Sequence, residues 1–243
     1  MIGKRDSTLK IFNDLSLWAN ELKNLEKQNV SIGFVPTMGA LHQGHSALLD
    51  RSRRENQVTV LSIYVNATQF DNKDDLAKYP KTLERDQEIA AEHGVDYILL
   101  PTYEQIYPDG YRYKVTENDF SNQLCGAYRP GHFDGVLTVV MKLLNIVSPK
   151  HAYFGEKDYQ QLQLITDMVK SFFMNVQVVP CTTVREADGL AMSSRNVRLT
   201  TEERALAPQF AKILRETETT AEAPKRYAAK GSIRLARIEA RET

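Results

Sequence analysis

The chain has 243 residues, of which 42% are hydrophobic and 26% charged, and this ordinary balance predicts a globular protein with a substantial core. Lysine and arginine number 31, as do aspartate and glutamate, so the zero net charge excludes a general basic surface for nucleic acid and an acidic excess typical of disorder. No apolar run approaches the roughly 20 residues that a membrane-spanning helix needs, and no signal-peptide core follows the first residues, so we expect a cytoplasmic protein without membrane contact.

The first third of the chain predicts a strand–helix–strand unit. Residues 9–27 carry apolar side chains at helical spacing, which is typical of an amphipathic helix packed on a sheet. Residues 30–35 form the apolar run of a buried strand, residues 46–56 return to helical spacing, and residues 58–66 form a second buried strand. Parallel strands joined by a helix end at one edge of a sheet, so Gln69 should face the same crevice as the loop after the first strand.

That loop lies within residues 34–45 and contains His42 and His45 at the start of a helix. The first N–H groups of a helix lack partners and attract anions, Gly39 and Gly44 allow a phosphate to approach the backbone, and imidazole N–H groups can bind the same anion. The two histidines could instead cap the helix as purely structural groups, and this stretch alone leaves that alternative open. A zinc site is disfavoured because the other histidines and the two cysteines stand singly along the chain.

The rest of the chain continues to alternate between helices and strands. The further elements expected, in chain order, are helix 80–94, strand 95–101, helix 136–147, strand 152–154, helix 158–173 and strand 176–180. Residues 71–79 and 129–135 have the composition of loops, and residues 102–121 give no clear pattern. The alternation predicts an α/β fold with a doubly wound, Rossmann-like parallel sheet. We expect a large domain over residues 1–182 and a small C-terminal region over residues 183–243.

Two later segments also favour phosphate binding. Lys157 and Asp158 follow a strand and a glycine at the start of a helix, which repeats the arrangement of the histidine loop. Residues 184–196 show neither helical nor strand periodicity but contain Ser193-Ser194-Arg195, whose two hydroxyls and guanidinium suit a polyphosphate. A solvated turn is the alternative interpretation of that loop. A capped helix should begin near Thr200, and the chain beyond residue 215 should be poorly packed or disordered.

Six segments in this order resemble the pantothenate synthetases, also called pantoate–β-alanine ligases, of the H-x-G-H nucleotidyltransferase superfamily. The matching segments are residues 35–45, 64–70, 79–83, 129–136, 154–161 and 185–196. The resemblance implies an ATP-dependent ligase that converts pantoate to pantoyl adenylate with release of pyrophosphate, and then transfers the acyl group to β-alanine with release of AMP. It also implies Mg²⁺ carried on the ATP phosphates rather than held in a protein cage, and a homodimer.

The resemblance also implies roles for individual residues. His45 would be the acid-type catalytic residue, with His42, Lys157 and Arg195 beside it on the phosphates, and Gln69 and Gln161 would bind pantoate. The residues implied for the ATP site as a whole are Met38, Gly39, Ala40, Leu41, His42, Gln43, Gly44, His45, Gly155, Glu156, Lys157, Asp158, Val184, Met192, Ser193, Ser194 and Arg195.

Two departures from the family pattern affect the expected activity. Ala67 stands where the family usually has proline, which should loosen the Gln69 loop slightly. In the family the C-terminal region usually closes over the site, and here we expect that region to be shortened or replaced. The alternatives are therefore a nucleotide-binding protein of the same fold with impaired or no turnover, and a nucleotidyltransferase that stops at the adenylated product.

Overall fold

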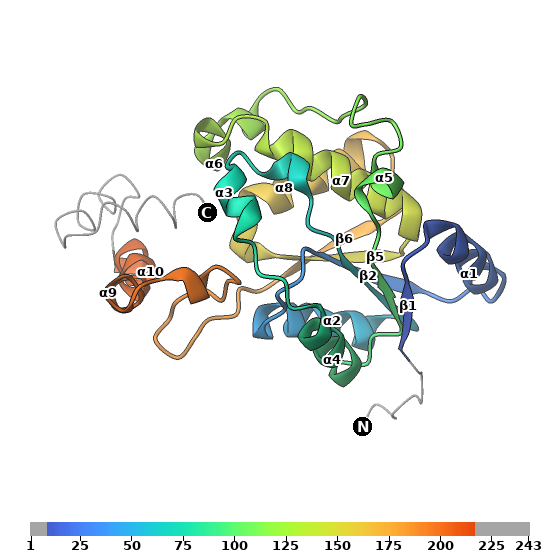
Figure 1. Cartoon of the computed structure of the whole chain (residues 1–243), viewed down its shortest axis with the longest axis horizontal. Helices are drawn as coiled ribbons and strands as arrows, with labels where there is room; N and C mark the ends of the chain where they lie inside the picture. Colours follow the sequence, from blue (N-terminus) through green and yellow to red (C-terminus); the bar gives the residue numbers. More distant parts are fainter. Residues whose placement is uncertain (1–8, 217–243) are drawn as a thin grey trace.

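The computed structural model describes residues 9–216, which form one parallel sheet with helices on both faces (Figure 1). The strands are β1 (Lys10–Phe12), β2 (Ile32–Thr37), β3 (Val58–Ile63), β4 (Tyr97–Leu99), β5 (His151–Gly155) and β6 (Gln177–Cys181). Their spatial order is β1-β4-β3-β2-β5-β6, and every neighbouring pair is parallel. The prediction of a doubly wound sheet is confirmed, because the chain builds outward from β2 in one direction and then returns to place β5 and β6 on its other side.

The helices of the described residues cover both faces of this sheet, except for the last two, which extend beyond it (Figure 1). They are α1 (Leu15–Lys27), α2 (Gln43–Glu55), α3 (Lys73–Ala77), α4 (Leu83–Glu92), α5 (Tyr103–Ile106), α6 (Leu124–Tyr128), α7 (His132–Val147), α8 (Tyr159–Ser171), α9 (Thr201–Leu206) and α10 (Pro208–Glu216). In Figure 1, α7 and α8 lie above the sheet and α2 and α4 lie below it. No helix within residues 9–216 is long and apolar enough to cross a membrane.

Alternation along the strands divides the core into two hydrophobic clusters. Phe34 and Val60 face the cluster formed with α1, α7 and α8, whereas their successors Val35 and Leu61 face the cluster formed with α2 and α4. Successive strand residues point to opposite faces, so a strand covered on both sides must be apolar at consecutive positions. This explains why the sequence of the central strands reads as continuous apolar runs.

Trp18 anchors α1 to the first of these clusters. Its side chain is fully buried, and its indole N–H donates to the main-chain carbonyl of Ile146 at 2.8 Å. The ring lies edge-on to Phe12 of β1 and to Tyr97 of β4, with centroids 5.6 and 5.5 Å away. Burying an aromatic side chain of this size contributes roughly 1.5–3 kcal/mol, and the satisfied N–H avoids the cost of an unpaired buried donor. The N-terminal helix is thereby tied to the sheet edge.

The described part of the C-terminal region has a small core of its own. Leu190 packs with Ala207, Phe210 and Ile213, and α9 begins with the expected capping box between Thr200 and Glu203. Helices α9 and α10 extend away from the sheet at the end of the molecule drawn in orange in Figure 1. The expectation for the chain beyond residue 216 lies outside the described residues.

Several local elements differ from the expectations. Residues 10–12 form edge strand β1 rather than the start of a helix, because three residues are too short to show a period. Residues 73–77 form α3, whose cap Asn72 accepts from the N–H of Asp74, where a loop was expected. Helix α7 begins at His132 rather than Val136, because Gly131 adopts a positive φ of 77° and turns the chain into it. Helix α6 was not expected.

Gly33 on β2 provides a test of how closely α2 packs on the sheet. A Cβ at this position would lie 2.3 Å from the hydroxyl of Ser52 and 2.4 Å from the amide nitrogen of Asn56, both buried on or just after α2. We expect Gly33→Ala to lower the free energy of unfolding by about 1–3 kcal/mol, because these hydrogen-bonded groups must shift. Urea denaturation measures this change. Gly155→Ala is the matched control, since its Cβ would meet its nearest atom at 3.9 Å, and equal losses in both variants would contradict the prediction.

Candidate active site

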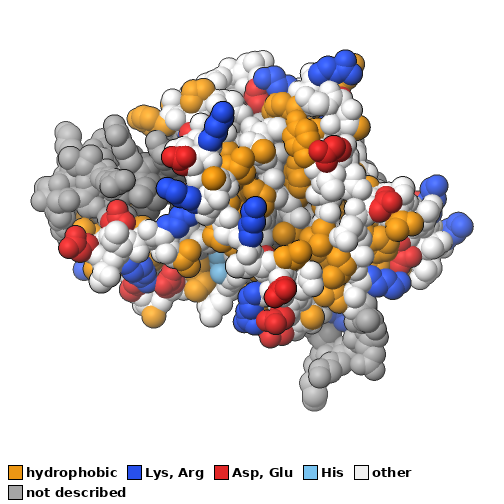
Figure 2. Space-filling model, viewed as in Figure 1, with side chains coloured by type: hydrophobic (Ala, Val, Ile, Leu, Met, Phe, Trp, Pro, Cys, Tyr) orange, Lys and Arg blue, Asp and Glu red, His pale blue; other side chains and the backbone are white. Residues whose placement is uncertain are grey.

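A cleft of about 1160 Å³ opens where the strand order reverses, outside the carboxyl ends of β2 and β5. Ligands of open α/β sheets bind at such switch points, because the loops on either side run in opposite directions and leave a crevice. The cleft is lined by residues that follow β2, β3, β5 and β6, together with the start of α7. Figure 2 shows lysine and arginine side chains interspersed with acidic ones over the face it draws, so neither sign of charge dominates there.

His42 and His45 cap the start of α2 and line the cleft. The Nδ1 atom of His42 accepts from the N–H of Gly44 at 3.1 Å, and the Nδ1 atom of His45 accepts from the N–H of His42 at 3.3 Å. An Nδ1 atom that accepts carries no proton, so in each neutral ring the proton is on Nε2. Capping and function are therefore compatible: the backbone bonds fix both tautomers and leave two N–H groups as donors for an anion.

Burial keeps both imidazoles neutral. Desolvation, assisted by His42 and Lys157, lowers the pKa of His45 to about 3, and desolvation followed by the charge of Lys157 lowers the pKa of His42. A second proton on either ring would also break its backbone bond. An acid role for His45 stays a prediction, and the geometry offers a second role, because a neutral Nε2–H group can donate a hydrogen bond to a phosphate without giving up its proton.

Asp86 of α4 supports the loop that leads to these histidines. Its buried carboxylate accepts from the main-chain N–H of Ala40 at 3.0 Å and of Leu41 at 2.8 Å. Gly39 and Ala40 both have positive φ values, 85° and 52°, and the second is strained for a residue with a Cβ. Asp86 stabilises that conformation, so it determines how the chain enters α2 although it lies 46 positions away from Ala40.

Lys157 lies on the β5 side of the cleft. It is in the short turn Glu156–Asp158 directly after β5, and its ammonium is 3.5 Å from the carboxylate of Asp158. Lys157 and Asp158 both line the cleft, whereas Glu156 does not. The charge of Lys157 contributes to the lowered pKa of both His42 and His45, so its ammonium lies close enough to act on both rings.

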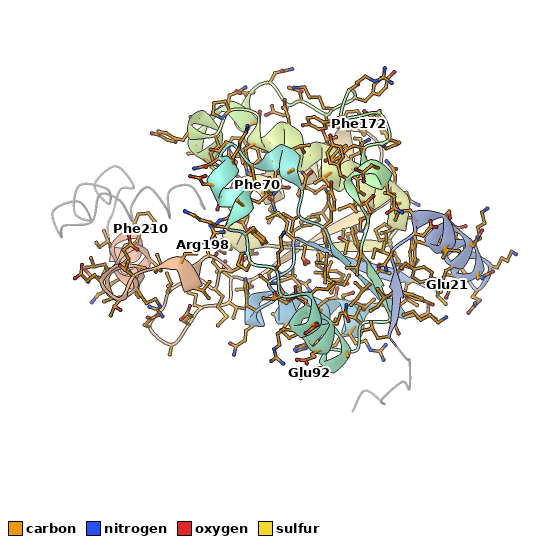
Figure 3. The ribbon with its side chains drawn as sticks, in the orientation of Figure 1. Glu21, Phe70, Glu92, Phe172, Arg198 and Phe210 are labelled. Atoms are coloured by element: carbon orange, nitrogen blue, oxygen red, sulfur yellow. The ribbon has the colours of Figure 1, made fainter. Side chains whose placement is uncertain are left out.

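The loop after β6 reaches the cleft together with α3. Ser194 lies 3.3 Å from the hydroxyl of Tyr79, and the guanidinium of Arg195 lies over the ring of Tyr79, 5.8 Å from its centroid. Asp75 of α3 forms ion pairs with Arg195, at 3.1 Å, and with Arg198. Burial raises the pKa of Asp75, but its hydrogen bonds to the two arginines outweigh burial and keep the pKa below its usual value. Figure 3 shows Arg198 between the sheet and the C-terminal helices.

Gln69 and Gln161 face the cleft from other directions. The side-chain oxygen of Gln69 accepts from the amide of Asn66 at 3.0 Å, so its NH₂ end is the donor available to a ligand. Gln161 lies on the first turn of α8, and its neighbour Gln160 is buried and bonds instead to the backbone of Phe120, Gln123 and Cys125. The two adjacent glutamines thus have different roles.

The structure gathers most, but not all, of the residues expected in the site. The cleft is lined by Met38, His42, Gly44, His45, Gln69, Gly155, Lys157, Asp158, Gln161, Val184, Met192, Ser193, Ser194 and Arg195. From the stretch 38–45, Gly39, Ala40, Leu41 and Gln43 are not among the residues that line the cleft, and their expected place in the ATP site stays a prediction. The N–H groups of the first three bond to Thr37 and Asp86, so they are not available to a phosphate.

Other cleft residues were missed by sequence reasoning. Asn66, Tyr79, Arg129 and His132 lie within segments that carry the family resemblance, and that position was the signal that could have identified them. The acidic and basic side chains of Asp71, Asp75 and Arg198 had no such signal, because only the folded arrangement brings them to the cleft. Among the residues the structure describes, no group of three or more histidine, cysteine, aspartate or glutamate side chains is arranged to hold a metal ion.

Comparison with known proteins identifies the family of this chain. A family model described as pantoate-beta-alanine ligase matches residues 10–242. The chain belongs to the pantoate–β-alanine ligase family. It is therefore a ligase, and the alternative of a protein without turnover is not favoured. The pantothenate synthetase of Bdellovibrio bacteriovorus, a relative within this family, is 57% identical over 207 residues, which are 85% of this chain and 82% of that protein.

Further members of the family show the same similarity in sequence and in fold. The pantothenate synthetase of Legionella pneumophila (strain Lens) is 50% identical over 223 residues, covering 92% of this chain and 88% of that protein. The pantoate–β-alanine ligase of Francisella tularensis, solved in complex with beta-gamma ATP and beta-alanine, has a TM-score of 0.86 and 41% identity, covering 92% of this chain and 87% of that one. The Thermus thermophilus pantothenate synthetase has a TM-score of 0.82 and 40% identity, covering 94% of this chain and 82% of that one.

Removal of the Asp86 carboxylate should destabilise the loop before α2. In Asp86→Ala the N–H groups of Ala40 and Leu41 lose their acceptor, and we expect the free energy of unfolding to fall by about 1–3 kcal/mol. Asp86→Asn retains one carbonyl oxygen and should lose less. Urea denaturation of both variants checks this order, and an Asn variant less stable than the Ala variant would contradict it.

Stability should also decrease in mild acid. The folded-state pKa is lowered to about 3 for His45 and, by burial and then Arg129, to about 4 for His132. Because the unfolded chain binds these protons near pH 6.5, stability is greatest above that pH and falls toward pH 4, with a slope near 1.4 kcal/mol per pH unit for each histidine. Urea titrations from pH 7.5 to 4.5 measure the slope. It should be shallower in His132→Asn, and an unchanged slope in that variant would count against the prediction.

Proposed function

We propose that the chain condenses pantoate with β-alanine in two steps within this cleft. A carboxylate oxygen of pantoate attacks the α-phosphorus of ATP, the bond to the bridging oxygen breaks, and pyrophosphate leaves. The amine of β-alanine then attacks the acyl carbon of pantoyl adenylate, loses a proton, and displaces AMP. The observation that carries this proposal is the convergence of His42, His45, Lys157, Gln69 and Gln161 on one cleft in a member of this family.

The histidines and cations would stabilise the charge of the triphosphate. Adenylation requires placement of a carboxylate and stabilisation of negative charge rather than a covalent enzyme intermediate. The Nε2–H groups of His42 and His45 act as donors to phosphate oxygens, and Lys157 and Arg195 supply positive charge. Ser193 and Ser194 add hydroxyl donors from the loop after β6. Mg²⁺ enters as part of the MgATP substrate, carried on the phosphates.

Gln69 and Gln161 would orient pantoate. Amide groups both donate and accept, so they suit a ligand that presents hydroxyls beside a carboxylate. The bond from Asn66 directs the NH₂ end of Gln69 outward, where it can hold an oxygen of pantoate for attack on the phosphorus. Holding two reactants in line can account for several kcal/mol of the barrier, and the two amides provide that alignment.

We also propose that the functional unit is a cytoplasmic homodimer in which residues 1–182 bind nucleotide and pantoate and residues 183–243 contribute the closing segment. Support for the two regions comes from the separate small core of Leu190, Ala207, Phe210 and Ile213. Sedimentation velocity of the full chain tests the dimer.

Turnover assays test the reaction directly. Purified protein with MgATP and pantoate should release pyrophosphate, and addition of β-alanine should yield AMP and pantothenate in equal amounts. Pyrophosphate release without consumption of β-alanine would indicate an enzyme that stops at the adenylate. Binding of ATP by calorimetry with no pyrophosphate release would refute the proposed catalysis.

Loss of the His45 donor should lower the rate of adenylation. We expect His45→Ala to lower kcat for pyrophosphate release by roughly 10²–10³-fold, because one preorganised donor to a developing charge is lost. His45→Gln, which keeps an N–H donor near the position of Nε2, should retain more activity. His93→Ala is the control, because His93 pairs with Asp50 outside the cleft. A near-native rate for His45→Ala would refute the assigned role.

A further inference from the structure

The segment Arg129–Val136 carries the family resemblance but has no role in the proposed chemistry. We propose that His132 is a positioning residue for Gln69: its ring N–H holds the main chain of Gln69 and sets the direction in which the Gln69 amide meets the acid substrate. The inference rests on the proposed function in one respect, the assignment of Gln69 to pantoate.

The hydrogen bonds of His132 determine its tautomer. Its ring is buried on the first turn of α7, with Nδ1 2.7 Å from the main-chain oxygen of Gln69 and Nε2 3.1 Å from a guanidinium nitrogen of Arg129. A guanidinium can only donate, so Nε2 must accept and the ring proton must be on Nδ1. The Nδ1–H group therefore donates to the carbonyl of Gln69, and both ring nitrogens of His132 are used.

Arg129 connects this bond to the other side of the same loop. Its Nε atom lies 3.1 Å from a carboxylate oxygen of Asp71, two residues beyond Gln69, and its side chain is largely buried. One guanidinium therefore orients the His132 ring and holds Asp71. The segment from 69 to 71 is thus attached at two points to the start of α7 through His132 and Arg129.

The backbone of α7 lies against this loop at close range. A Cβ at Gly135 would be 2.6 Å from the carbonyl oxygen of Thr68 and 2.7 Å from both N and Cα of Gln69, so only glycine permits this approach. The amide of Asn66 donates to the carbonyl of Gly135 at 3.1 Å and to the side-chain oxygen of Gln69 at 3.0 Å. Main chain and side chain of Gln69 are therefore both positioned from the first turn of α7, the main chain by His132 and the side chain through Asn66.

The neutral state of His132 is required for this arrangement. Burial, followed by the charge of Arg129, lowers its pKa to about 4, while the hydrogen bond to Gln69 and the charge of Asp71 act in the opposite direction and Arg195 adds to the lowering. A protonated ring would place an N–H against the N–H of Arg129. The neutral form keeps one acceptor for Arg129 and one donor for Gln69.

Two substitutions of His132 distinguish the hydrogen bond at Nδ1, to Gln69, from the hydrogen bond at Nε2, to Arg129. His132→Asn places an amide donor near the position of Nδ1 and can keep the bond to Gln69, whereas His132→Gln places its amide near Nε2 and loses that bond. Initial rates should be measured with pantoate varied at saturating MgATP, and with MgATP varied at saturating pantoate. We expect His132→Gln to raise the KM for pantoate by about 10–100-fold, with the KM for ATP within about twofold of wild type. His132→Asn should recover most of the loss.

A double-mutant cycle tests whether His132 acts through Gln69. In the Gln69→Ala background the amide that His132 positions is gone, so His132→Gln should add less than about twofold to the loss in kcat/KM for pantoate. Equal rises in the KM for pantoate and for ATP, failure of Asn to rescue better than Gln, or full additivity in the cycle would each overturn the inference. His93→Gln is the control, because His93 pairs with Asp50 and does not line the cleft.

The outcomes distinguish this inference from the proposed function. If wild type released no pyrophosphate, or if Gln69→Ala left the KM for pantoate unchanged, the proposed function would fail irrespective of His132. Urea denaturation confirms that each variant is folded. Should His132→Gln lose its cooperative transition, Arg129→Gln provides the second test: the ring loses its orienting donor, and the KM for pantoate should rise several-fold more than the KM for ATP. Equal effects on both substrates would overturn the inference in that case also.

Discussion

The arrangement of this site depends on the hydrogen bonds between two imidazole rings and the backbone at the start of α2. A helix must satisfy its first N–H groups, and here His42 and His45 do so through Nδ1. The same bonds determine which nitrogen carries the proton and where it points. The bonds that cap the helix therefore also leave the two Nε2–H groups as donors for an anion. Neither ring can be protonated at Nδ1 without weakening the start of the helix.

Support for this start comes from distant parts of the chain. Asp86 stabilises the strained turn before it, and Gly33 allows α2 to lie close to the sheet through Ser52 and Asn56. On the other side of the cleft, the start of α7 supports the Gln69 loop in a comparable way. The loop before α2 and the Gln69 loop both follow the end of a strand. Each is held in place by a polar side chain from a neighbouring helix, Asp86 of α4 for the first and His132 of α7 for the second.

The sequence predicted the sheet and the gathering of the main loops, because apolar runs identify buried strands and parallel strands end at one edge. It predicted His42, His45, Lys157 and Gln69 for the same reason. Asp86 and Asp75 could not be predicted, since their role depends on tertiary distances to residues far along the chain. The three-residue β1 was missed because so short a segment shows no period, and the neutrality of His45 was missed because it follows from burial rather than from residue type.

The pairing of Asp75 with Arg195 and Arg198 affects how an anion would bind in the cleft. Two guanidinium groups close together repel each other, and the Asp75 carboxylate that pairs with both acts as an internal counter-ion. A polyphosphate that bound to these arginines would therefore compete with a carboxylate that already neutralises part of their charge. The same competition would reduce the gain of a singly charged anion at these two arginines more than that of a ligand with several negative charges, so α3 would act on which anions bind there.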